Sequence, residues 1–342
     1  MRGAKGATTS TATKSKALGG GGSFSLVLQF NYLADNAVYR VVFDAWRRAF
    51  SPESIWVACP FSKDDKHTAT AKGEPGSASV KWLTYQSDRG YVSPYRNLAK
   101  VIAKSPKSKR FLYVHDDALL VRSVQFGEPN KGQPAVDGFF VGSFSLVPTA
   151  RLHSNGTTQA HHMDRWPFRD GRPVWAWWDG CVRSLASVLR DKGFLELFAS
   201  RLGSFGSSDV SSSGVGHSAS IYLDIFLGQA DMLFAELRGE KLRSDFLSFL
   251  QLLARSGVFL ECAIPTAIGF VQRLHKIEHV QVKLCTSWAA DRGTEAMLDN
   301  CPQEARAYHP YKVGTASGEG ANVTERLDTW RKKFDEMAAG IL

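Results

Sequence analysis

Three consecutive side chains, His115, Asp116 and Asp117, are the strongest candidates for chemistry in this sequence. They follow the apolar run Phe111 to Val114, which is typical of a buried strand. Two adjacent carboxylates at such a strand end repel each other and lose solvation, so they require a cation or hydrogen-bond donors nearby. Alternate residues of an extended chain share a side, which would turn His115 and Asp117 one way and Asp116 the other. The pattern favours a divalent metal on one side and a ligand hydroxyl on the other, with an exposed acidic turn as the alternative.

The preceding residues predict the scaffold that would position these groups. Residues 24–30 and 55–61 are short apolar runs typical of buried strands, and apolar residues between 38 and 50 recur at helical spacing. Strand, helix and strand in this order form a βαβ unit, which implies parallel strands. A third strand at 80–85, a helix at 93–104 and the strand at 111–114 extend the same pattern. We therefore expect an α/β fold with an open, mostly parallel central sheet flanked by helices, whose ligands bind at the carboxyl ends of the strands.

The second half of the sequence is less regular. Its apolar periodicity and its turn residues predict further elements, which are a strand at 139–147, a polar loop at 151–173, helices at 179–202 and 229–256, a Gly/Ser-rich segment at 203–220 and a last helix from Asn322 to about Met337. The helix at 179–202 is expected to break at Gly193, because glycine is a poor helix former.

The net positive charge does not by itself decide for or against a polynucleotide partner. Four of the 42 basic residues lie in the Gly/Ser/Thr-rich segment 1–23, which leaves 38 basic against 33 acidic residues for the body. That moderate excess suits an anionic small molecule at least as well as a nucleic acid. Because the sequence also contains no known nucleic-acid-binding motif, we expect no nucleic-acid partner. We interpret segment 1–23 as a disordered tail, and a transit-type leader is the alternative.

The compartment is left open by the sequence. No stretch reaches the roughly 20 apolar residues of a transmembrane helix, so we expect a soluble protein. Five cysteines without a C-x-x-C motif favour a reduced compartment such as the cytoplasm. Asn155-Gly156-Thr157 and Asn322-Val323-Thr324 would be glycosylation acceptors in an organelle or secretory lumen.

The acidic motif and the helix before it carry a resemblance. The string FLYVHDDALLV (Phe111 to Val121), preceded by SPYRNLAKVI (Ser93 to Ile102), resembles the strand and acidic motif of nucleotide-sugar-dependent glycosyltransferases with the GT-A fold. In that family the motif, written D-x-D, holds a Mn or Mg ion that bridges the two phosphates of the sugar donor. The resemblance implies that Asp117 is a metal ligand and Asp116 the second acid, while His115 stands where the pattern more often has Asp or Glu.

The resemblance extends to a late histidine. His309 in Tyr308-His309-Pro310-Tyr311-Lys312 is similar to the histidine that completes the metal site in many such enzymes, and Lys312 would then meet a phosphate. Carboxylate oxygens with one imidazole suit Mn or Mg better than a thiolate-preferring metal. Without the resemblance, His309 reads as a turn histidine packed by Pro310.

Three residues are candidates for contacts with the nucleotide-sugar donor. Tyr32, just after the first strand, would stack on the base, although a strand-end aromatic also serves a core. Arg96 and Asn97 lie on the helix ahead of the acidic motif, and similar helices in the family contact the donor. Arg96 can pair with a phosphate, or it can lie on a solvated helix face.

A transferase that inverts stereochemistry needs a carboxylate base at the acceptor hydroxyl. Glu261 is the first candidate, because a lone acid in the apolar run 258–265 must be paired, protonated or functional. Asp224 is the second candidate. The indoles of Trp175, Trp177 and Trp178 could line an acceptor site, but we expect at least two of them in the core.

The sequence therefore predicts a metal-dependent glycosyltransferase that moves a sugar from a UDP- or GDP-sugar to an unknown acceptor, a glycan or a protein. We expect one catalytic domain at 24–342, with a donor-binding half at 24–150 and an acceptor-binding half at 151–342. A metal-dependent phosphohydrolase could use the same His115, Asp116 and Asp117. A nucleic-acid-binding module supported by the basic tail is the alternative outside enzymes, although no known nucleic-acid motif is present.

Overall fold

The computed structural model describes residues 24–30, 46, 52–60, 79–85, 91–120, 138–202 and 221–286, together with 305, 307–309, 328–329, 331–332 and 335–336. The expected tail 1–23, the Gly/Ser-rich segment 203–220 and most of the expected helices 38–50 and 322–337 lie outside these residues. The described part contains no helix with the length and apolar character needed to cross a membrane.

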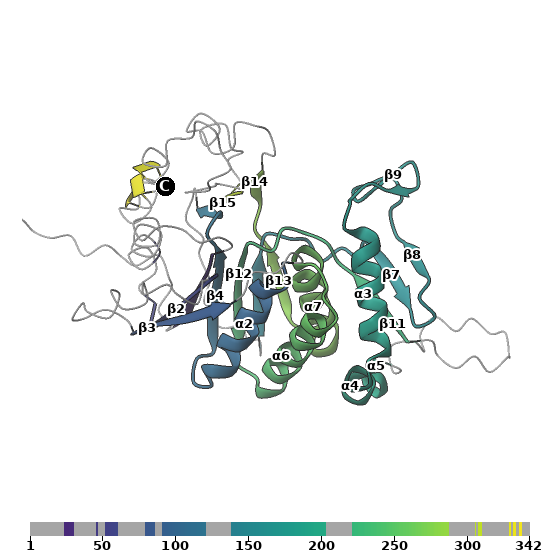
Figure 1. The fold of residues 1–342 in the computed structure, drawn as a ribbon, viewed down its shortest axis with the longest axis horizontal. Coiled ribbons are helices and arrows are strands. Elements are labelled where there is room, and N and C mark those ends of the chain that lie inside the picture. Colours follow the sequence, from purple (N-terminus) through teal and green to yellow (C-terminus); the bar gives the residue numbers. More distant parts are fainter. Residues whose placement is uncertain are drawn as a thin grey trace, which may run out of the picture.

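A seven-stranded sheet lies at the centre of the molecule (Figure 1). Its strands, in spatial order, are β13 (Glu278–Gln281), β6 (Gly138–Gly142), β12 (Met232–Leu237), β4 (Arg110–His115), β1 (Ser25–Gln29), β2 (Ser54–Pro60) and β3 (Ser79–Tyr85). Only β12 runs antiparallel to its neighbours, β4 and β6, and every other pair in this sheet is parallel. The open, mostly parallel sheet expected from the sequence is confirmed.

Three helices, α2 (Ser93–Lys104), α6 (Glu240–Arg255) and α7 (Leu260–His275), pack against one another beside this sheet (Figure 1). Each buries an apolar side, as the helical periodicity of their sequences requires. The Arg243 guanidinium of α6 fastens the end of α2, because it donates to the carbonyl oxygens of Ser105 at 2.7 Å and Ser108 at 2.6 Å. Helix α2 is thereby held in place against the sheet.

The remaining elements are short or lie beside the sheet. The helical ones are α3 (Trp178–Arg190), α4 (Lys192–Phe194), the π-helical turn η2 (Leu195–Ala199) and α5 (Ser200–Leu202). Three small antiparallel or mixed sheets contain β11 (Tyr222–Ile225), β7 (Ala150–His153) and β8 (Thr158–Ala160), then β9 (Phe168–Arg169) and β10 (Arg172–Pro173), then β14 (Leu284–Thr286), β15 (Ala307–His309) and β5 (Leu119–Leu120).

The helix predicted at 229–256 is wrong in its first part. Residues Met232–Leu237 form the buried strand β12, and α6 begins only at Glu240. Leu233 and Leu237 have helical spacing, but all six residues of the strand are buried. A strand covered on both faces is a continuous apolar run, so its period cannot be distinguished from that of a short helix segment.

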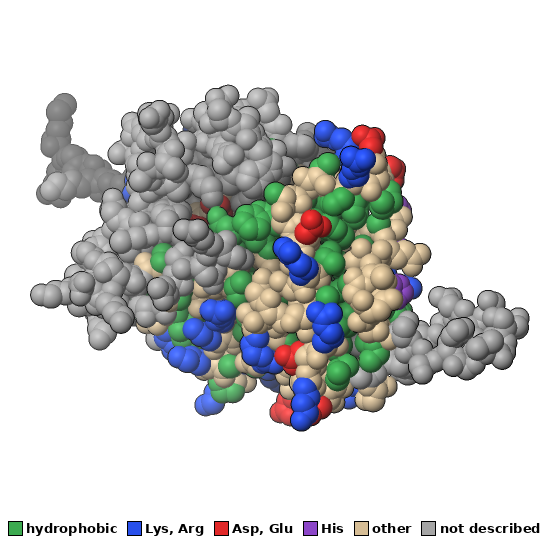
Figure 2. Space-filling model, turned by 45° about the vertical axis from the view of Figure 1, so that its right-hand side comes forward, with side chains coloured by type: hydrophobic (Ala, Val, Ile, Leu, Met, Phe, Trp, Pro, Cys, Tyr) green, Lys and Arg blue, Asp and Glu red, His purple; other side chains and the backbone are tan. Residues whose placement is uncertain are grey.

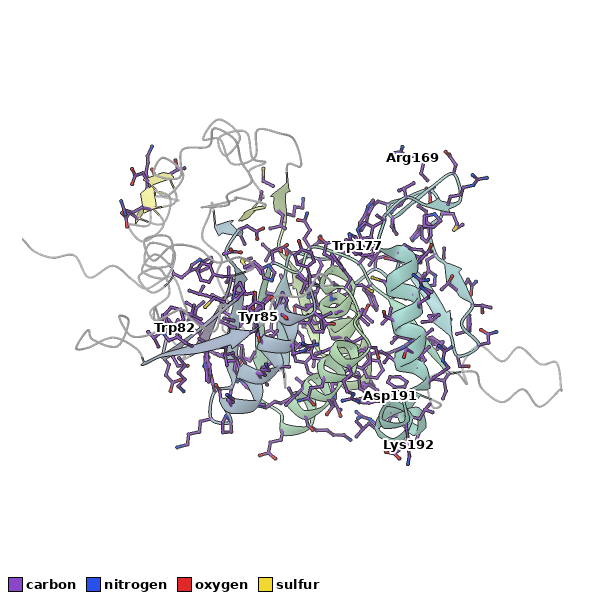
Figure 3. All side chains as sticks on the ribbon, in the orientation of Figure 1. Trp82, Tyr85, Arg169, Trp177, Asp191 and Lys192 are labelled. Carbon is purple, nitrogen blue, oxygen red and sulfur yellow. The ribbon has the colours of Figure 1, made fainter. Side chains whose placement is uncertain are left out.

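Three other boundaries also differ from the predictions. The polar loop expected at 151–173 contains the short strands β7 to β10, and the strand expected at 139–147 ends at Gly142. The helix expected at 179–202 breaks at Asp191 rather than at Gly193 (Figure 3). Asp191 has extended backbone angles, and its carboxylate accepts from the N–H groups of Gly193 at 2.8 Å and Phe194 at 3.3 Å. It starts a new helix as an N-cap, which is a stronger local preference than the glycine two residues later.

The described surface and the cysteines bear on the partner and the compartment. On the face in Figure 2, Lys and Arg side chains are scattered with acidic groups among them instead of forming one stripe. Cys59, Cys181 and Cys262 are free and buried, whereas Cys285 is disulfide-bonded. Since disulfides are typical of oxidising compartments, the preference for a reduced compartment loses its basis.

Candidate active site

Three buried side chains, His115, Asp117 and Asp231, come together where β4 ends and β12 begins. One nitrogen or oxygen atom from each lies within 4.8 Å of the other two. Nδ1 of His115 lies 3.5 Å from Oδ1 of Asp231. Carboxylate oxygens with one imidazole nitrogen form a donor set that suits Mn or Mg. These residues fit a divalent cation both in chemistry and in spacing.

The backbone at the end of β4 produces this arrangement. The N–H of His115 donates to the carbonyl of Asp231 at 2.8 Å, which places the start of β12 beside it. The next N–H, of Asp116, donates to the carbonyl of Gln29 at 2.9 Å and ties the motif to β1. Asp116 and Asp117 then form a turn closed by the N–H of Ala118, which donates to His115 at 3.2 Å. His115 and Asp117 share a side, as expected, but because of a turn and not because the chain is extended.

Asp231 was not among the residues predicted from the sequence. The mistaken helix at 229–256 concealed it, because a residue just before a strand lies at a sheet edge whereas a residue inside a helix does not. The run Met232–Leu237, bounded by Gly228 and Gly239, was the signal that could have found it. Gly228 has its own reason to be glycine, since a Cβ there would overlap the Cβ of Phe144 and lie 3.1 Å from its Cα.

Tyr113 bears directly on His115. Its hydroxyl makes a short hydrogen bond to Nε2 of His115 in the interior of the sheet. Burial raises the pKa of Tyr113 well above its ordinary value of 10, and the nearby charge of Asp231 adds to the effect. The phenol therefore stays protonated and can also accept a hydrogen bond. When Nε2–H of the imidazole donates to the phenol oxygen, Nδ1 keeps its lone pair on the side of Asp231, where a metal would need it.

A second buried polar group adjoins the cluster at the end of β1. Gln29 pairs in register with His115, and its amide donates to the Phe30 carbonyl at 2.8 Å and to the Tyr85 hydroxyl at 2.7 Å. Asn97, from α2, donates to the Gln29 side chain at 3.2 Å. Within the described residues, the side-chain oxygen of Asn97, Oδ1, is buried with no hydrogen-bond partner. A polar network thus extends along the carboxyl ends of the parallel strands, where open α/β sheets bind ligands.

The other residues expected at the donor side are placed differently. Arg96 is exposed on α2, next to the buried Asn97. Tyr32 and Lys312 lie outside the described residues, so their contacts remain predictions. His309 is described only by its backbone. Strand β15 pairs Ala307 with Leu120 and Tyr308 with Leu119, so it runs toward Asp117 and brings the His309 backbone to the acidic motif.

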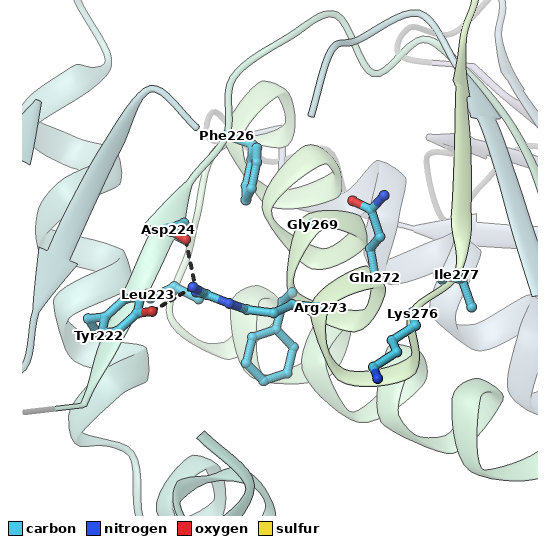
Figure 4. Close-up of a pocket in the computed structure, with 10 residues that line it drawn as sticks. Tyr222, Leu223, Asp224, Phe226, Gly269, Gln272, Arg273, Lys276 and Ile277 are labelled. Carbon is cyan, nitrogen blue, oxygen red and sulfur yellow. Dashed lines mark hydrogen bonds and ion pairs between the residues drawn. The ribbon is translucent and has the colours of Figure 1, made fainter. Parts of the chain in front are cut away.

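The two candidate bases lie in different surroundings. The Asp224 carboxylate, on β11, binds Nε of Arg151 at 3.0 Å and Nη1 of Arg273 at 2.9 Å. It lines a cavity of about 480 Å3 together with Tyr222 and the last turns of α7 (Figure 4). Glu261 is half-buried in the first turn of α7, at the other end of this helix. Its carbonyl accepts from the N–H of Gly228 at 3.0 Å, which connects it to the loop that leads to Asp231.

Comparison with known proteins gives likenesses of structure only. No protein-family model matches the chain, and no curated protein matches it in sequence. Similar solved structures include the galactosyltransferase LgtC in complex with donor and acceptor sugar analogs, 11% identical, which covers 90% of this chain and 95% of that one at a TM-score of 0.39. Mouse xyloside xylosyltransferase 1 is 11% identical, with 86% and 99% covered and a TM-score of 0.34.

A third similar structure is a putative glucose-1-phosphate thymidylyltransferase from Bacillus anthracis, 9% identical, with 90% and 99% covered and a TM-score of 0.38. Glycosyltransferases are thus found among the structural neighbours. At these TM-scores the likenesses carry no conclusion about function, which has to come from the residues themselves.

Proposed function

We propose that this protein is a metal-dependent glycosyltransferase that moves a sugar from a nucleoside diphosphate sugar to an acceptor hydroxyl. The observation that carries the proposal is the buried cluster of His115, Asp117 and Asp231 at the carboxyl ends of β4 and its neighbours. The acid-rich FLYVHDDALLV string that resembles the glycosyltransferase motif supplies two of these three residues.

Each residue has a proposed role in that reaction. His115, Asp117 and Asp231 would hold Mn or Mg, with His309 as a further candidate ligand. The ion, when bound, would neutralise the charge that develops on the departing diphosphate. Asp116, Tyr32, Arg96, Asn97 and Lys312 are proposed to contact the donor.

Glu261 is our choice for the base that takes the proton from the acceptor hydroxyl, if the reaction inverts stereochemistry. The hydrogen bond from Gly228 to Glu261 supports this choice, because it joins α7 to the loop that ends at Asp231. Asp224 is the second choice. Two guanidinium groups already occupy its two carboxylate oxygens, which leaves them less free to contact an acceptor hydroxyl.

A metal-dependent phosphohydrolase is the competing function, because the same three ligands could serve it. It would release phosphate from a simple ester and would ignore added acceptors. The nucleic-acid alternative depends on the basic tail, and that tail lies outside the described residues.

Thermal unfolding with nucleotide sugars tests the proposal. UDP- and GDP-sugars should raise the unfolding temperature of the wild type when Mn or Mg is present, because a ligand that binds the folded state stabilises it. Asp231→Asn should remove the metal-dependent part of this shift, while Lys100→Ala, which changes an exposed side chain of α2 that is not among the proposed donor contacts, should keep it. Equal shifts of the unfolding temperature with and without metal would refute the assignment. Release of phosphate from p-nitrophenyl phosphate as fast as sugar transfer would refute it as well.

A further inference from the structure

Five aromatic rings form a continuous surface cluster at the first turns of α7 and α3. Phe259 lies at its centre, and the ring of Trp177 stacks on it at 4.8 Å with an interplanar angle of 19°. Trp175 and Tyr91 meet Phe259 edge-on at 5.7 Å and 5.4 Å, and Trp166 lies 5.7 Å from Trp175. We refer to these five residues as the aromatic platform.

The platform is exposed to a degree that packing does not require. Tyr91, Trp166 and Trp177 expose 44%, 55% and 47% of their surfaces, although large aromatic side chains are mostly buried in soluble proteins. Stacking on Phe259 therefore leaves much of the Trp177 ring open to solvent. Of the three neighbouring indoles, Trp178 is buried in the core, Trp175 is half-buried against it and Trp177 is exposed. A contiguous exposed aromatic surface is typical of a binding site.

Part of the platform is fixed by packing against the protein interior. Phe259 and Trp175 are half-buried and pack against the hydrophobic core. The Tyr95 hydroxyl donates to the carbonyl of Val258 at 2.5 Å and so fixes the residue before Phe259. Tyr91 has a φ of 49°, a left-handed backbone conformation that bulky residues rarely adopt and that is commonly found at functional sites. A ligand that binds to rings already held in place loses little binding free energy to the ordering of those side chains.

The platform adjoins the candidate active site through two chain segments. Phe259 immediately precedes the first turn of α7, where the Glu261 carbonyl accepts from Gly228 at 3.0 Å. Gly228 and Asp231 are three positions apart in the chain, which corresponds to at most about 11 Å between their Cα atoms. Tyr91 precedes α2, which carries Asn97 into the network around Gln29. Figure 3 shows Trp177 at the upper end of α3, on the side that faces α7.

The charges around the rings indicate what kind of molecule would bind. Acidic and basic side chains are mixed in the segment that carries Trp166, where Asp164 and Asp170 lie among Arg165, Arg169 and Arg172, and all five are exposed. Asp179 is exposed two residues after Trp177. An anionic lipid surface or a polyanion would need an excess of basic groups. Mixed polar groups beside flat rings instead match a neutral ligand with hydroxyl groups and apolar faces.

We infer that the aromatic platform binds the sugar rings of a carbohydrate acceptor, with Trp177 as the principal stacking surface. The inference rests on the proposed glycosyltransferase function for its link to catalysis, and it narrows the acceptor class from glycan or protein to glycan. The C–H faces of pyranose rings would pack on the indoles, and the exposed carboxylates of Asp164, Asp170 and Asp179 would accept hydrogen bonds from the sugar hydroxyls.

Intrinsic fluorescence tests the inference without requiring catalysis. Full-length protein is titrated with neutral tetrasaccharides of glucose, galactose, mannose, xylose and N-acetylglucosamine. At least one of them should change the indole emission of the wild type. Trp177→Ala should weaken its binding about tenfold or more, and Trp177→Phe should retain most of it, because an aromatic face remains. The matched control is Leu197→Ala, which truncates an exposed apolar side chain outside the platform, on η2. It should bind the saccharide like the wild type.

A parallel measurement separates the platform from the metal site. Trp177→Ala should keep the metal-dependent stabilisation by UDP- or GDP-sugars, while the KM for the saccharide rises and hydrolysis of the donor without acceptor is unchanged. Equal saccharide affinity in the wild type and in Trp177→Ala would overturn the inference. So would binding of phosphatidylcholine vesicles or apolar peptides without binding of any saccharide. Saccharide binding without any metal-dependent nucleotide binding would support the platform and refute the proposed transferase function instead.

Discussion

Two carboxylate clusters in this protein use the same kind of acid in opposite ways. Asp231 and Asp117 gather around the imidazole of His115 at the edge of the central sheet. Asp224, in the small sheet of β11, β7 and β8, lies between the guanidinium groups of Arg151 and Arg273. Both guanidiniums also lie over the ring of Tyr222, at 4.0 Å and 4.8 Å from its centre.

The difference concerns how the negative charge is balanced. The Asp224 cluster carries its own cations in a fixed geometry, so the folded chain alone completes it, and its value is structural. The His115 cluster combines two carboxylates with a side chain that binds metals when neutral, so an added divalent cation would balance it. The first cluster should therefore govern stability and the second metal-dependent binding. This separation can be tested one residue at a time.

The largest effect is expected for Asp117→Ala. Loss of this carboxylate should reduce metal-dependent transfer by about 100- to 1,000-fold, because charge stabilisation at the leaving diphosphate depends on the ion. Steady-state rates over a Mn titration give the measurement, with urea unfolding to verify that the fold persists. Asp224→Asn neutralises the acid of the other cluster, and it should retain the wild-type rate if Glu261 rather than Asp224 is the base. A similar loss of activity in both variants would mean that the two clusters do not differ in the way described.

The converse change, Asp224→Asn, should affect stability. It leaves two partly buried guanidinium groups without their carboxylate, and we expect a loss of about 2 kcal/mol in the free energy of unfolding, below the cost of a fully buried pair because both arginines reach solvent. Urea denaturation measures this loss. The metal-dependent shift of the unfolding temperature by nucleotide sugars should keep its wild-type size. An unchanged midpoint would show that the arginine cluster contributes nothing to the fold.

A smaller effect is expected for Tyr113→Phe. The phenol contacts the imidazole nitrogen that would face away from the metal, and loss of such an orienting partner weakens metal binding by about tenfold. Calorimetric titration with Mn measures the affinity. Tyr95→Phe removes another buried phenol, which donates to Val258 and Leu253 and not to His115, so its Mn affinity should equal that of the wild type. If both variants bind Mn equally well, Tyr113 does not orient His115.

The parallel half of the sheet could be predicted because its strands are apolar and the chain segments before and after them are polar or rich in glycine. Residues 24–30 and 55–61 are apolar runs set among glycine and polar segments, and a buried parallel strand has just that composition. Strand β12 is misread as helix because only four residues, 238–241, separate Leu237 from Leu242, the first buried residue of α6, so the two segments appear as one helix. Its antiparallel place between β4 and β6 is a tertiary fact that local periodicity does not contain.

The same limit applies to the candidate site. His115 and Asp117 lie two residues apart at the end of a strand, so local reasoning reached them. Asp231 is more than a hundred residues away and meets them only through the pairing of β12 with β4. The exposure of Trp177 beside the buried Trp178 also depends on where α3 begins, and the sequence alone does not fix that point within one residue.

The smallest effect concerns a second imidazole and isolates what is special about His115. His279, on the edge strand β13, donates from Nε2 to the Phe144 carbonyl at 2.7 Å and stacks on the Phe144 ring at 5.0 Å. Its Nδ1 is buried and has no hydrogen-bond partner within the described residues. Burial lowers its pKa below the ordinary 6.5, although the Phe144 carbonyl opposes the shift. This imidazole faces a carbonyl and a ring, whereas His115 faces a carboxylate.

Because the pKa of His279 is lowered in the folded state, the unfolded chain takes up the proton first as pH falls. The stability that His279 contributes is complete above pH 6.5 and is lost progressively as pH falls below that value toward the lowered pKa. His279→Gln keeps a donor for the Phe144 carbonyl but does not titrate, so its free energy of unfolding should fall less between pH 7 and 5 than that of the wild type. His161→Gln, which removes an exposed imidazole, should retain the wild-type slope. If the free energy of unfolding changes equally with pH in all three proteins, His279 takes up its proton as readily in the folded chain as in the unfolded one. His279 and His115 would then differ only in the groups that surround them.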